Sequence, residues 1–534
     1  MTPVAQFELV LLLLAAVVVL ELLARRLRLP PAAAFVLGGA ALAVAPGAPG
    51  VTLDPELVLV LFLPPLLMSS AHFTAWRDFR ANLRIILQLA VGAVVFTTLV
   101  VGVVAHLVVP GLPWAACFAL GAIVSPPDAV AAKAVLAGVR LPRRVVVLLE
   151  GESLVNDATG IVLFRMAVAA SVTGAFSVAD AAASFAVLSV GGVAAGVACG
   201  FVAVAVMSRL RDPHLAIVFS LLVSWASYIG AEALGVSGVL SAVAAGLVTG
   251  WRQHSTLTAL ARTELTAVWG ALTYVLEALV FILIGLSLRG VLPRLQDVPG
   301  GVASLLLPGG AILLTVVLSR FAWIFPATYL PRWLIPALRR RDPTPPVAVP
   351  IIMSWAGMRG VVSLAVALGL PEGFPGRDFI LVTTFAVILM TVLVQGATLG
   401  PLIRALHLDG FVLHGPENMS ETMPEAAARA SMAAAQLAVV QARAVLPDGT
   451  ERHPRLLEQY AYRARASARF SEAAGGLDDS KAEHFGIVLS AIEAGRAEVL
   501  RLHRDKHIHD TVLHALEQEL DLEELSARRH LAGP

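Results

Sequence analysis

Two carboxylates five positions apart, Glu152 and Asp157, stand inside an apolar stretch of this 534-residue chain. The stretch begins Gly-Glu-Ser-Leu-Val-Asn-Asp at 151–157 and stays largely apolar to Ala170. It is long enough to cross a bilayer, which takes roughly 20 helical residues. A charged side chain near the centre of a membrane helix costs ~2.5–3.5 kcal/mol on insertion scales. Two such acids in one segment therefore mark it as the part of the chain where chemistry is expected.

Helical geometry separates the two acids. At 3.6 residues per turn, five positions correspond to about 140° around the axis, so one acid can face a partner helix while the other faces a cavity. Ser153 and Asn156 lie one turn apart and add neutral oxygens beside Asp157. An acid that is costly to charge and surrounded by neutral oxygens suits competition between a proton and a cation. The alternative is a polar cluster that only joins helices by hydrogen bonds.

A second polar motif, Ser125-Pro126-Pro127-Asp128, interrupts another apolar segment. Two prolines break the helical hydrogen-bond ladder and leave backbone carbonyls free. We expect Ser125 and Pro126 to cap and begin a new half-helix, with Asp128 in its first turn, where the helix dipole favours a negative charge. Asp128 then either caps this half-helix or also contributes, with the freed carbonyls, to an ion site near the midplane.

A third motif, Gly357-Met358-Arg359-Gly360, places an arginine in the membrane. A buried guanidinium needs a carboxylate or several carbonyl oxygens as partners. We expect Arg359 to pair with Glu152 and so to leave Asp157 free to change its protonation state. Glu277 and Arg320 are further charges in the middle of apolar segments, and whether they pair with each other is left open.

The composition explains why such charges stand out. The chain is 57% hydrophobic and 14% charged, whereas soluble proteins carry about 25% charged residues. This composition predicts an all-α polytopic membrane protein. The net charge of +1 gives no reason to expect nucleic acid as a partner. The two cysteines, Cys117 and Cys199, lie in separate apolar segments, so neither a disulfide framework nor a cysteine metal site is expected.

Apolar windows predict thirteen spans by the criterion of about 20 residues. Their ranges are 7–24, 31–46, 55–72, 83–109, 113–138, 145–170, 179–207, 213–231, 235–250, 264–288, 302–330, 347–370 and 378–403. Arginines collect in alternate loops, beginning with Arg25, Arg26 and Arg28, which follow the first span. Because basic residues favour the cytoplasmic side, the alternation places the N-terminus outside and the C-terminus inside. Basic residues after rather than before the first span argue against a cleaved signal peptide.

The composition changes near residue 407, where charged residues and alanine begin to dominate. We therefore predict a transmembrane domain over 1–406 and a helical cytosolic tail over 407–534. Four histidines gather in this tail: His503, His507, His509 and His514. We expect them to lie on a solvated helix face, and a pH sensor or a metal site is the alternative.

Several motifs together resemble the sodium/proton antiporters of the NHE/NhaP type. They are Gly-Glu-Ser-x-x-Asn-Asp at 151–157, Asp-Ala-Val-Ala at 128–131, Gly-Met-Arg-Gly at 357–360, Phe-Leu-Pro-Pro-Leu-Leu at 62–67 and Val-Gln-Gly at 394–396. The resemblance covers roughly the first 400 residues, in order. It implies inverted repeats, discontinuous crossing helices, a dimerisation domain and a moving core domain, and hence a homodimer.

The resemblance also implies roles for single residues. Asp157 is expected to bind a cation or a proton in turn, helped by Asn156, Ser153 and Asp128. Glu152 and Arg359 are expected to form the stabilising ion pair. Pro127 stands where many relatives have threonine, and its backbone carbonyl could still serve as a ligand. Relatives with Asn-Asp at 156–157 are typically electroneutral.

The expected function is exchange of sodium or lithium for protons across the inner cell membrane by alternating access. The protein is expected to have no cofactor, to be no enzyme, and to meet only the two transported ions, membrane lipid and a second copy of itself. A potassium/proton antiporter remains an alternative within the same class. From other classes, a channel and an intramembrane hydrolase remain, although Ser153 has no histidine or lysine near it in its span.

Overall fold

The computed structural model describes residues 3–27, 29–45, 55–128, 141–174, 177–291, 301–406, 425–444, 451–472 and 478–531. Helices are the only elements in these ranges, which confirms the predicted all-α fold class. The chain separates into two compact units, Met1–Glu417 and Asn418–Pro534. The predicted boundary after residue 406 borders residues 407–424, which lie outside the described ranges, so it stays a prediction.

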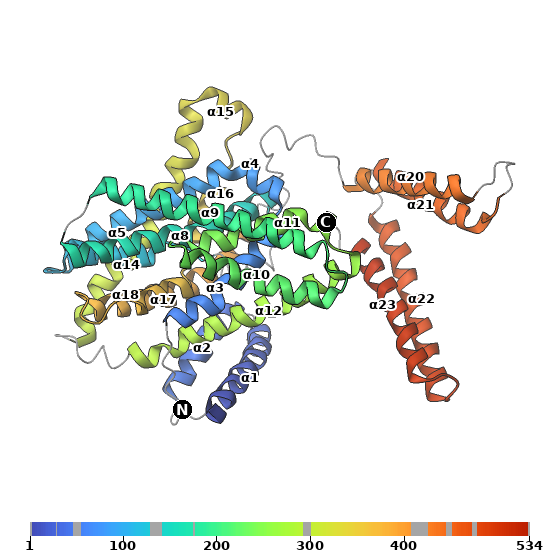
Figure 1. Ribbon diagram of the computed structural model, residues 1–534, viewed down its shortest axis with the longest axis horizontal. Helices are drawn as coiled ribbons and strands as arrows, with labels where there is room; N and C mark the ends of the chain where they lie inside the picture. The colour runs from blue at the N-terminus through green and yellow to red at the C-terminus, as the bar shows by residue number, and fades with distance from the viewer. Residues whose placement is uncertain are drawn as a thin grey trace. The chain divides into compact units, whose positions relative to one another are not determined.

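The first unit is a bundle of long helices that lie side by side (Figure 1). Its first half consists of α1 (Pro3–Leu27), α2 (Pro31–Val44), α3 (Pro55–Phe73), α4 (Trp76–Leu87), the π-helical turn η1 (Gln88–Ala93), α5 (Val94–Val108), α6 (Trp114–Val124) and α8 (Arg143–Thr173). It continues with α9 (Val178–Met207), α10 (Pro213–Ala233), α11 (Gly238–Thr256), α12 (Ala259–Leu286), α14 (Gly301–Leu334), α15 (Pro336–Arg341), α16 (Ala348–Trp355), α17 (Val361–Leu368), α18 (Arg377–Met390), the π-helical turn η2 (Thr391–Gln395) and α19 (Gly396–Ala405).

Local sequence sets several of the helix ends. Asp212 caps α10 by accepting hydrogen bonds from the backbone N–H groups of His214 (2.8 Å) and Leu215 (3.3 Å). The hydroxyl of Ser237 caps α11 in the same way. The helix α8 ends at Gly174, whose φ of 67° is left-handed and suits glycine. These ends follow from short-range chemistry, and the last of them fixes the end of α8, which carries Glu152 and Asp157.

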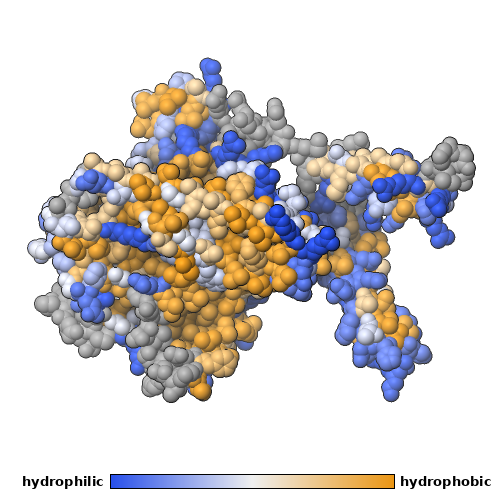
Figure 2. All heavy atoms as spheres, viewed as in Figure 1, coloured by the Kyte–Doolittle hydropathy of each residue, from blue (hydrophilic) through white to orange (hydrophobic). Residues whose placement is uncertain are grey.

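The outward faces of the bundle are apolar. Leu307 is 75% exposed and Val190 is 69% exposed, and Figure 2 shows hydrophobic side chains over most of the visible face of the bundle. Within the described ranges, nine helical segments are long and apolar enough to cross a membrane: Phe7–Leu27, Glu56–Phe73, Trp76–Val108, Arg143–Thr173, Ala179–Met207, Pro213–Ala233, Ala259–Val291, Leu305–Leu334 and Arg377–Ala405. Apolar side chains exposed on such helices are expected to face lipid, so this is a multi-pass membrane protein.

Each of the thirteen predicted ranges contains a helix or the halves of a broken one. The range 113–138 contains α6 and then a break, and its residues 129–138 lie outside the described part. The range 347–370 contains α16 and α17 with a non-helical stretch between them. The range 347–370 thus contains a discontinuous helix as predicted, whereas the second half of the one predicted over 113–138 lies outside the described residues and the number of complete crossings stays a prediction.

The second unit contains α20 (Glu425–Ala444), α21 (Pro454–Glu472), α22 (Asp478–Arg504) and α23 (Asp510–Leu531). Arg496 on α22 pairs with Asp521 (2.6 Å) and Glu524 (2.8 Å) on α23. Hydrogen bonds from Arg528 and Arg496 lower the pKa of Glu524. His503 lies 2.5 Å from Asp510, and no group of three or more potential metal-binding side chains occurs among the residues described. This arrangement matches the expected solvated helix face, and a role in pH sensing is not tested.

Candidate functional site

The two broken helices meet inside the bundle. The helix α6 ends at Val124, and residues 356–360 separate α16 from α17. The Nε of Arg359 donates to the carbonyl of Val124 at 2.5 Å. The backbone N–H of Asp128 donates to the carbonyl of Met358 at 2.6 Å. Two segments more than 200 positions apart in the chain therefore satisfy each other's backbone groups, as irregular backbone at membrane depth requires.

The break after α6 begins where the two prolines remove backbone N–H donors. Ser125 is the C-terminal cap residue of α6, and its hydroxyl donates to the carbonyl of Ala122 (3.3 Å) and lies 3.0 Å from the hydroxyl of Thr98 on α5. The half-helix expected to follow falls on residues 129–140, outside the described ranges. The capping role of Ser125 and Pro126 in that half-helix therefore stays a prediction.

The helix α8 carries Glu152, Asn156 and Asp157 into the bundle, and all three are buried. The amide Nδ2 of Asn156 donates to the carbonyl of Pro127, which joins α8 to the break after α6. The Oδ1 of Asn156 is buried and has no hydrogen-bond partner among the described residues. Ser153 is half-buried on the same helix. Five of the predicted site residues are thus on α8 or bonded to it.

Asp157 differs from the other buried charges around it. It retains 9% exposure, and within the described ranges its carboxylate forms neither a hydrogen bond nor an ion pair. One face of α8 presents Glu152 to α14, while Asn156 turns toward the break at Pro127. The separation expected from helical geometry is therefore realised, with one acid engaged by a partner helix and the other left without one in the described structure.

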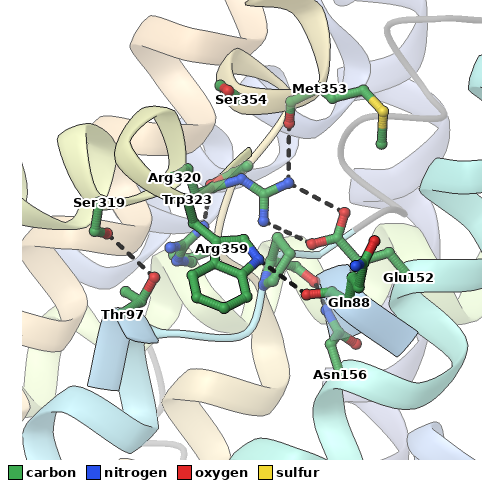
Figure 3. A network of polar contacts seen from close by, with 12 residues as sticks. Gln88, Thr97, Glu152, Asn156, Ser319, Arg320, Trp323, Met353, Ser354 and Arg359 are labelled. Carbon is green, nitrogen blue, oxygen red and sulfur yellow. Dashed lines mark hydrogen bonds and ion pairs between the residues drawn. The ribbon is translucent and has the colours of Figure 1, made fainter. Parts of the chain in front are cut away.

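Glu152 is held by Arg320 of α14. The guanidinium Nη1 and Nη2 of Arg320 donate to the two carboxylate oxygens at 2.7 and 3.1 Å, and Nη2 also donates to the carbonyl of Met353 at 2.9 Å. Figure 3 shows the guanidinium of Arg320 between the Met353 carbonyl and the Glu152 carboxylate. Both side chains are only 2% exposed. A two-point ion pair of this kind is the geometry in which arginine and carboxylate interact most strongly.

The Glu152–Arg320 pair differs from the pairing expected for Glu152 and identifies the partner of Arg320, which the sequence left open. The predicted pairing of Glu152 with Arg359 is wrong, because Arg320 occupies that place. The question of whether Arg320 pairs with Glu277 is answered in the same way, since its carboxylate partner is Glu152. Gly357 makes room for this arrangement, because a Cβ there would overlap the Cδ of Arg320.

Arg359 is fully buried and donates to backbone carbonyls instead, although its Nη2 has no hydrogen-bond partner among the described residues. Its Nη1 donates to the carbonyl of Gly357, and its Nε to that of Val124. Its own backbone N–H donates to the hydroxyl of Thr391 in the π-helical turn η2 at 3.1 Å. The carbonyl at the end of α6 carries the partial negative charge of a helix C-terminus, so it offsets the guanidinium charge. Several carbonyls were the alternative to a carboxylate that the sequence allowed.

Asp128 lies at the start of α17. Its side chain packs against Gly360, the residue before that helix, where a Cβ would overlap the Asp128 carboxylate. The N-terminus of a helix carries partial positive charge, so a carboxylate is favoured there. Asp128 therefore adjoins the start of α17, which belongs to the other broken segment. The half-helix predicted to begin near Asp128 on its own segment is a separate element.

Comparison with known proteins identifies the relationship. Residues 10–405 match the family described as sodium/hydrogen exchanger, transmembrane. The chain belongs to the sodium/hydrogen exchanger family. An uncharacterised Na+/H+ exchanger of Mycobacterium tuberculosis is 33% identical over 517 residues, which cover 94% of this chain and 93% of that protein. The sodium, potassium, lithium and rubidium/H+ antiporter of Bacillus pumilus is 34% identical over 403 residues, covering 71% of this chain and 60% of that protein.

A solved structure shares the fold. The sodium/proton antiporter MjNhaP1 of Methanocaldococcus jannaschii has a TM-score of 0.58 and 19% identity, over 76% of this chain and 100% of that one. The family match over residues 10–405 confirms the resemblance seen in the sequence motifs at the level of the family. Its known relatives are transporters, and the hydrolase alternative gains no support from them.

The sequence analysis did not identify two of the ion pairs in this exchanger. Arg320 was visible as a charge in an apolar segment, but nothing in the sequence indicated which acid it faces. Arg165 on α8 pairs with Glu232 of α10 at 3.0 Å, whereas the sequence showed only two charges in or near apolar segments. For both pairs, the sequence signal was a charged residue in an apolar segment. Because an isolated charge in a membrane is costly, such a residue is expected to have a partner, but the sequence does not indicate which residue that is.

Proposed function

We propose that this exchanger moves sodium or lithium ions one way and protons the other way across the cell membrane, using Asp157 as a shared binding site. The observation that carries the proposal is the contrast around Asp157. Glu152 and Arg320 form an ion pair and Arg359 donates to two backbone carbonyls, whereas Asp157 forms no ion pair or hydrogen bond in the described part of the chain. A buried carboxylate that no described protein group balances is suited to binding a mobile counter-ion.

The mechanism follows from the charge of that carboxylate. A bare carboxylate is costly where water is excluded, so a conformational change that seals the site is unfavourable while Asp157 is unoccupied. A bound proton or a bound monovalent cation neutralises the charge and allows the change. Each neutral state holds one monovalent ion, either the cation or the proton, so one cation exchanges for one proton without net charge movement. Alternating access between the two sides then gives electroneutral antiport.

The cation would be held by hard oxygen ligands around Asp157. The Oδ1 of Asn156 is buried without a partner among the described groups, and it lies on the same helix. The carbonyl of Pro127 accepts from Asn156 and keeps a second lone pair for an ion. Ser153 and Asp128 complete the proposed set, and the hydroxyl of a threonine at position 127 is not needed in this scheme. Glu152, with Arg320 in place of Arg359, has the structural role.

The test is exchange in proteoliposomes. Asp157→Asn keeps the shape of the side chain but removes its titratable charge, and we expect it to abolish sodium-driven proton movement. Glu372→Gln, which removes an exposed carboxylate from a loop between α17 and α18, is the matched control and should exchange at the normal rate. Undiminished exchange by Asp157→Asn, in protein that is folded and inserted, would overturn the assignment of the site.

A potassium/proton antiporter is the second candidate. It is supported by the Bacillus pumilus relative, whose name includes potassium and rubidium as well as sodium and lithium. Exchange rates with sodium, lithium, potassium and rubidium, measured at equal concentrations in the same vesicles, distinguish the two. Rates that are highest for sodium and lithium support the first candidate, and equal or higher rates for potassium support the second.

The proposal also includes the setting of the protein. Because arginines collect in alternate loops, we place the N-terminus outside and the tail in the cytosol, with the protein in the inner cell membrane. The family resemblance leads us to expect a homodimer. Labelling of single cysteines introduced at Thr256 and at Glu372, on opposite sides in this topology, tests the orientation. Labelling of both positions from the same side would contradict it.

A further inference from the structure

Three arginines converge on one carboxylate at one end of the bundle. Asp342, which follows α15, is buried and accepts from Arg84 of α4 (3.1 Å), Arg144 of α8 (2.7 Å) and Arg332 of α14 (2.6 Å). Within the described ranges, three guanidinium groups thus contact this one carboxylate, and Arg144 also donates to the Oδ1 of Asn82 at 3.1 Å. In the low dielectric of a protein interior such a cluster attracts a further negative charge.

A groove of about 560 Å³ opens beside this cluster. Phe325, Tyr329 and Trp333, all on α14, line its apolar side. Arg332, Arg339 and Thr344 also line it and are its polar residues. Its volume lies within the range of about 300–1,000 Å³ typical of small-molecule sites. The basic side chains suit an anion, and the aromatic wall suits a hydrocarbon chain.

The groove lies where a membrane helix ends. The segment Leu305–Leu334 is one of those long and apolar enough to span a bilayer, and it carries the apolar side of the groove. At its C-terminal end Trp333 is 76% exposed and is followed by exposed Leu334 and Ile335, and then by exposed Arg339 and Arg340. Figure 2 shows this projecting α14–α15 end with hydrophobic side chains below a hydrophilic tip. Exposed aromatic and aliphatic residues followed by arginines are typical of the membrane interface.

We propose that this groove binds an anionic phospholipid of the surrounding bilayer. The phosphate lies against Arg339, within the field of the Asp342 cluster, and an acyl chain lies along Phe325, Tyr329 and Trp333. A bilayer lipid fits better than a second protein, because the apolar wall belongs to a membrane-spanning helix while the charged end lies at its terminus. A phospholipid has the same two parts in the same order.

Occupancy of this site acts on the helices that carry the exchange site. Arg332 is twelve residues from Arg320 on α14, which corresponds to about 18 Å along the axis. The Asp342 cluster and the Glu152–Arg320 pair therefore join the same two helices, α8 and α14, at two levels. A lipid at the groove is expected to stabilise the packing of α8 on α14 without contacting Asp157.

The test uses the full-length protein purified in detergent. Its unfolding temperature is measured with added phosphatidylglycerol, with phosphatidylcholine and with inorganic phosphate. Native mass spectrometry counts the lipids retained under the same conditions. We expect phosphatidylglycerol to raise the unfolding temperature and to be retained, and the other two additives to have little effect, because only a ligand bound to the folded state stabilises it.

Variants locate the effect. Arg339→Ala with Arg340→Ala, and separately Trp333→Ala, alter exposed side chains and should leave the unliganded protein folded while reducing the stabilisation by phosphatidylglycerol at least threefold. Arg211→Ala removes an exposed arginine from another loop that is expected on the same side, and should change nothing.

Three outcomes would overturn the proposal. Equal stabilisation by phosphatidylcholine would exclude a headgroup site, and equal stabilisation by inorganic phosphate would show a simple anion site. A lipid-independent crosslink between two copies through a cysteine at position 333 would show that a second protein, and not lipid, occupies the groove.

Discussion

Two arginines are buried beside the same broken helix, α16–α17, yet protein groups balance their charges in different ways. Arg320 forms a two-point ion pair with Glu152 and donates to one carbonyl. Arg359 has no carboxylate partner among the described residues and donates to the carbonyls of Val124 and Gly357. The first arginine joins two continuous helices, and the second joins two helix breaks. A buried charge in this fold can therefore be balanced by an acid or by the exposed ends of interrupted helices.

The comparison has an energetic consequence. Removing one partner of a buried ion pair typically costs about 3–5 kcal/mol, because the other charge stays buried without compensation. Losing a hydrogen bond between a charged group and a neutral one costs about 1.5–3 kcal/mol. The Glu152–Arg320 pair should therefore contribute more to stability, while Arg359 should matter more for the geometry of the crossing.

The largest effect is expected for Glu152→Gln. The guanidinium of Arg320 then keeps only neutral partners, and the stability of the detergent-solubilised protein should fall by about 3–5 kcal/mol. Thermal unfolding measures it. The double variant Glu152→Gln with Arg320→Met removes the uncompensated charge as well and should recover part of the loss. A double variant less stable than the sum of the two single changes would contradict the pair.

Arg359→Gln should cost less, about 1.5–3 kcal/mol, because it leaves carbonyls rather than a charge without a partner. A double-mutant cycle sharpens the comparison. Glu152 and Arg320 should show strong coupling in unfolding measurements, and Glu152 and Arg359 weak coupling. The reverse pattern would restore the pairing expected from the sequence.

Gly360→Ala tests the contact between the two breaks directly. Its Cβ would overlap the carboxylate of Asp128, and overpacking of this kind costs about 1–3 kcal/mol. We expect exchange in proteoliposomes to slow severely, since Asp128 must move. Gly230→Ala, at a helical position where a Cβ meets nothing within 4 Å, is the matched control. Normal exchange by Gly360→Ala would show that the position of Asp128 is unimportant.

The smallest effect is expected for Arg165→Gln. Arg165 and Glu232 also form an ion pair, but their side chains are 50% and 31% exposed. An exposed pair contributes about 0–1 kcal/mol, so the unfolding temperature should scarcely change. A loss as large as that of Glu152→Gln would show that exposure does not explain the difference between the two pairs.

Much of the fold was predictable because its signals are local. Proline lacks a backbone N–H, so the break at Pro126 and Pro127 could be identified from the sequence, and the apolar windows located the helices. The acids at 152 and 157 were recognisable because charge in a membrane is costly. These local signals identified the family and most of the candidate site.

The partners of the charges were not predictable. Arg320 and Arg359 both lie far from Glu152 in the chain, and either could have met it. The choice depends on how each helix is rotated about its axis and on the room that Gly357 leaves for Arg320. Rotation of one helix against another is set by packing over the whole bundle, and no single motif contains it.

The central claim is that a cation and a proton compete for Asp157. The most direct test is the apparent KM for sodium in proteoliposomes, measured at a series of pH values kept equal on both sides. In the range where Asp157 is mostly protonated, competition predicts that KM rises about tenfold for each unit of decrease in pH, with the maximal rate reached again at high sodium. A KM that does not change with pH, while the maximal rate falls, would show that the two ions bind at separate sites.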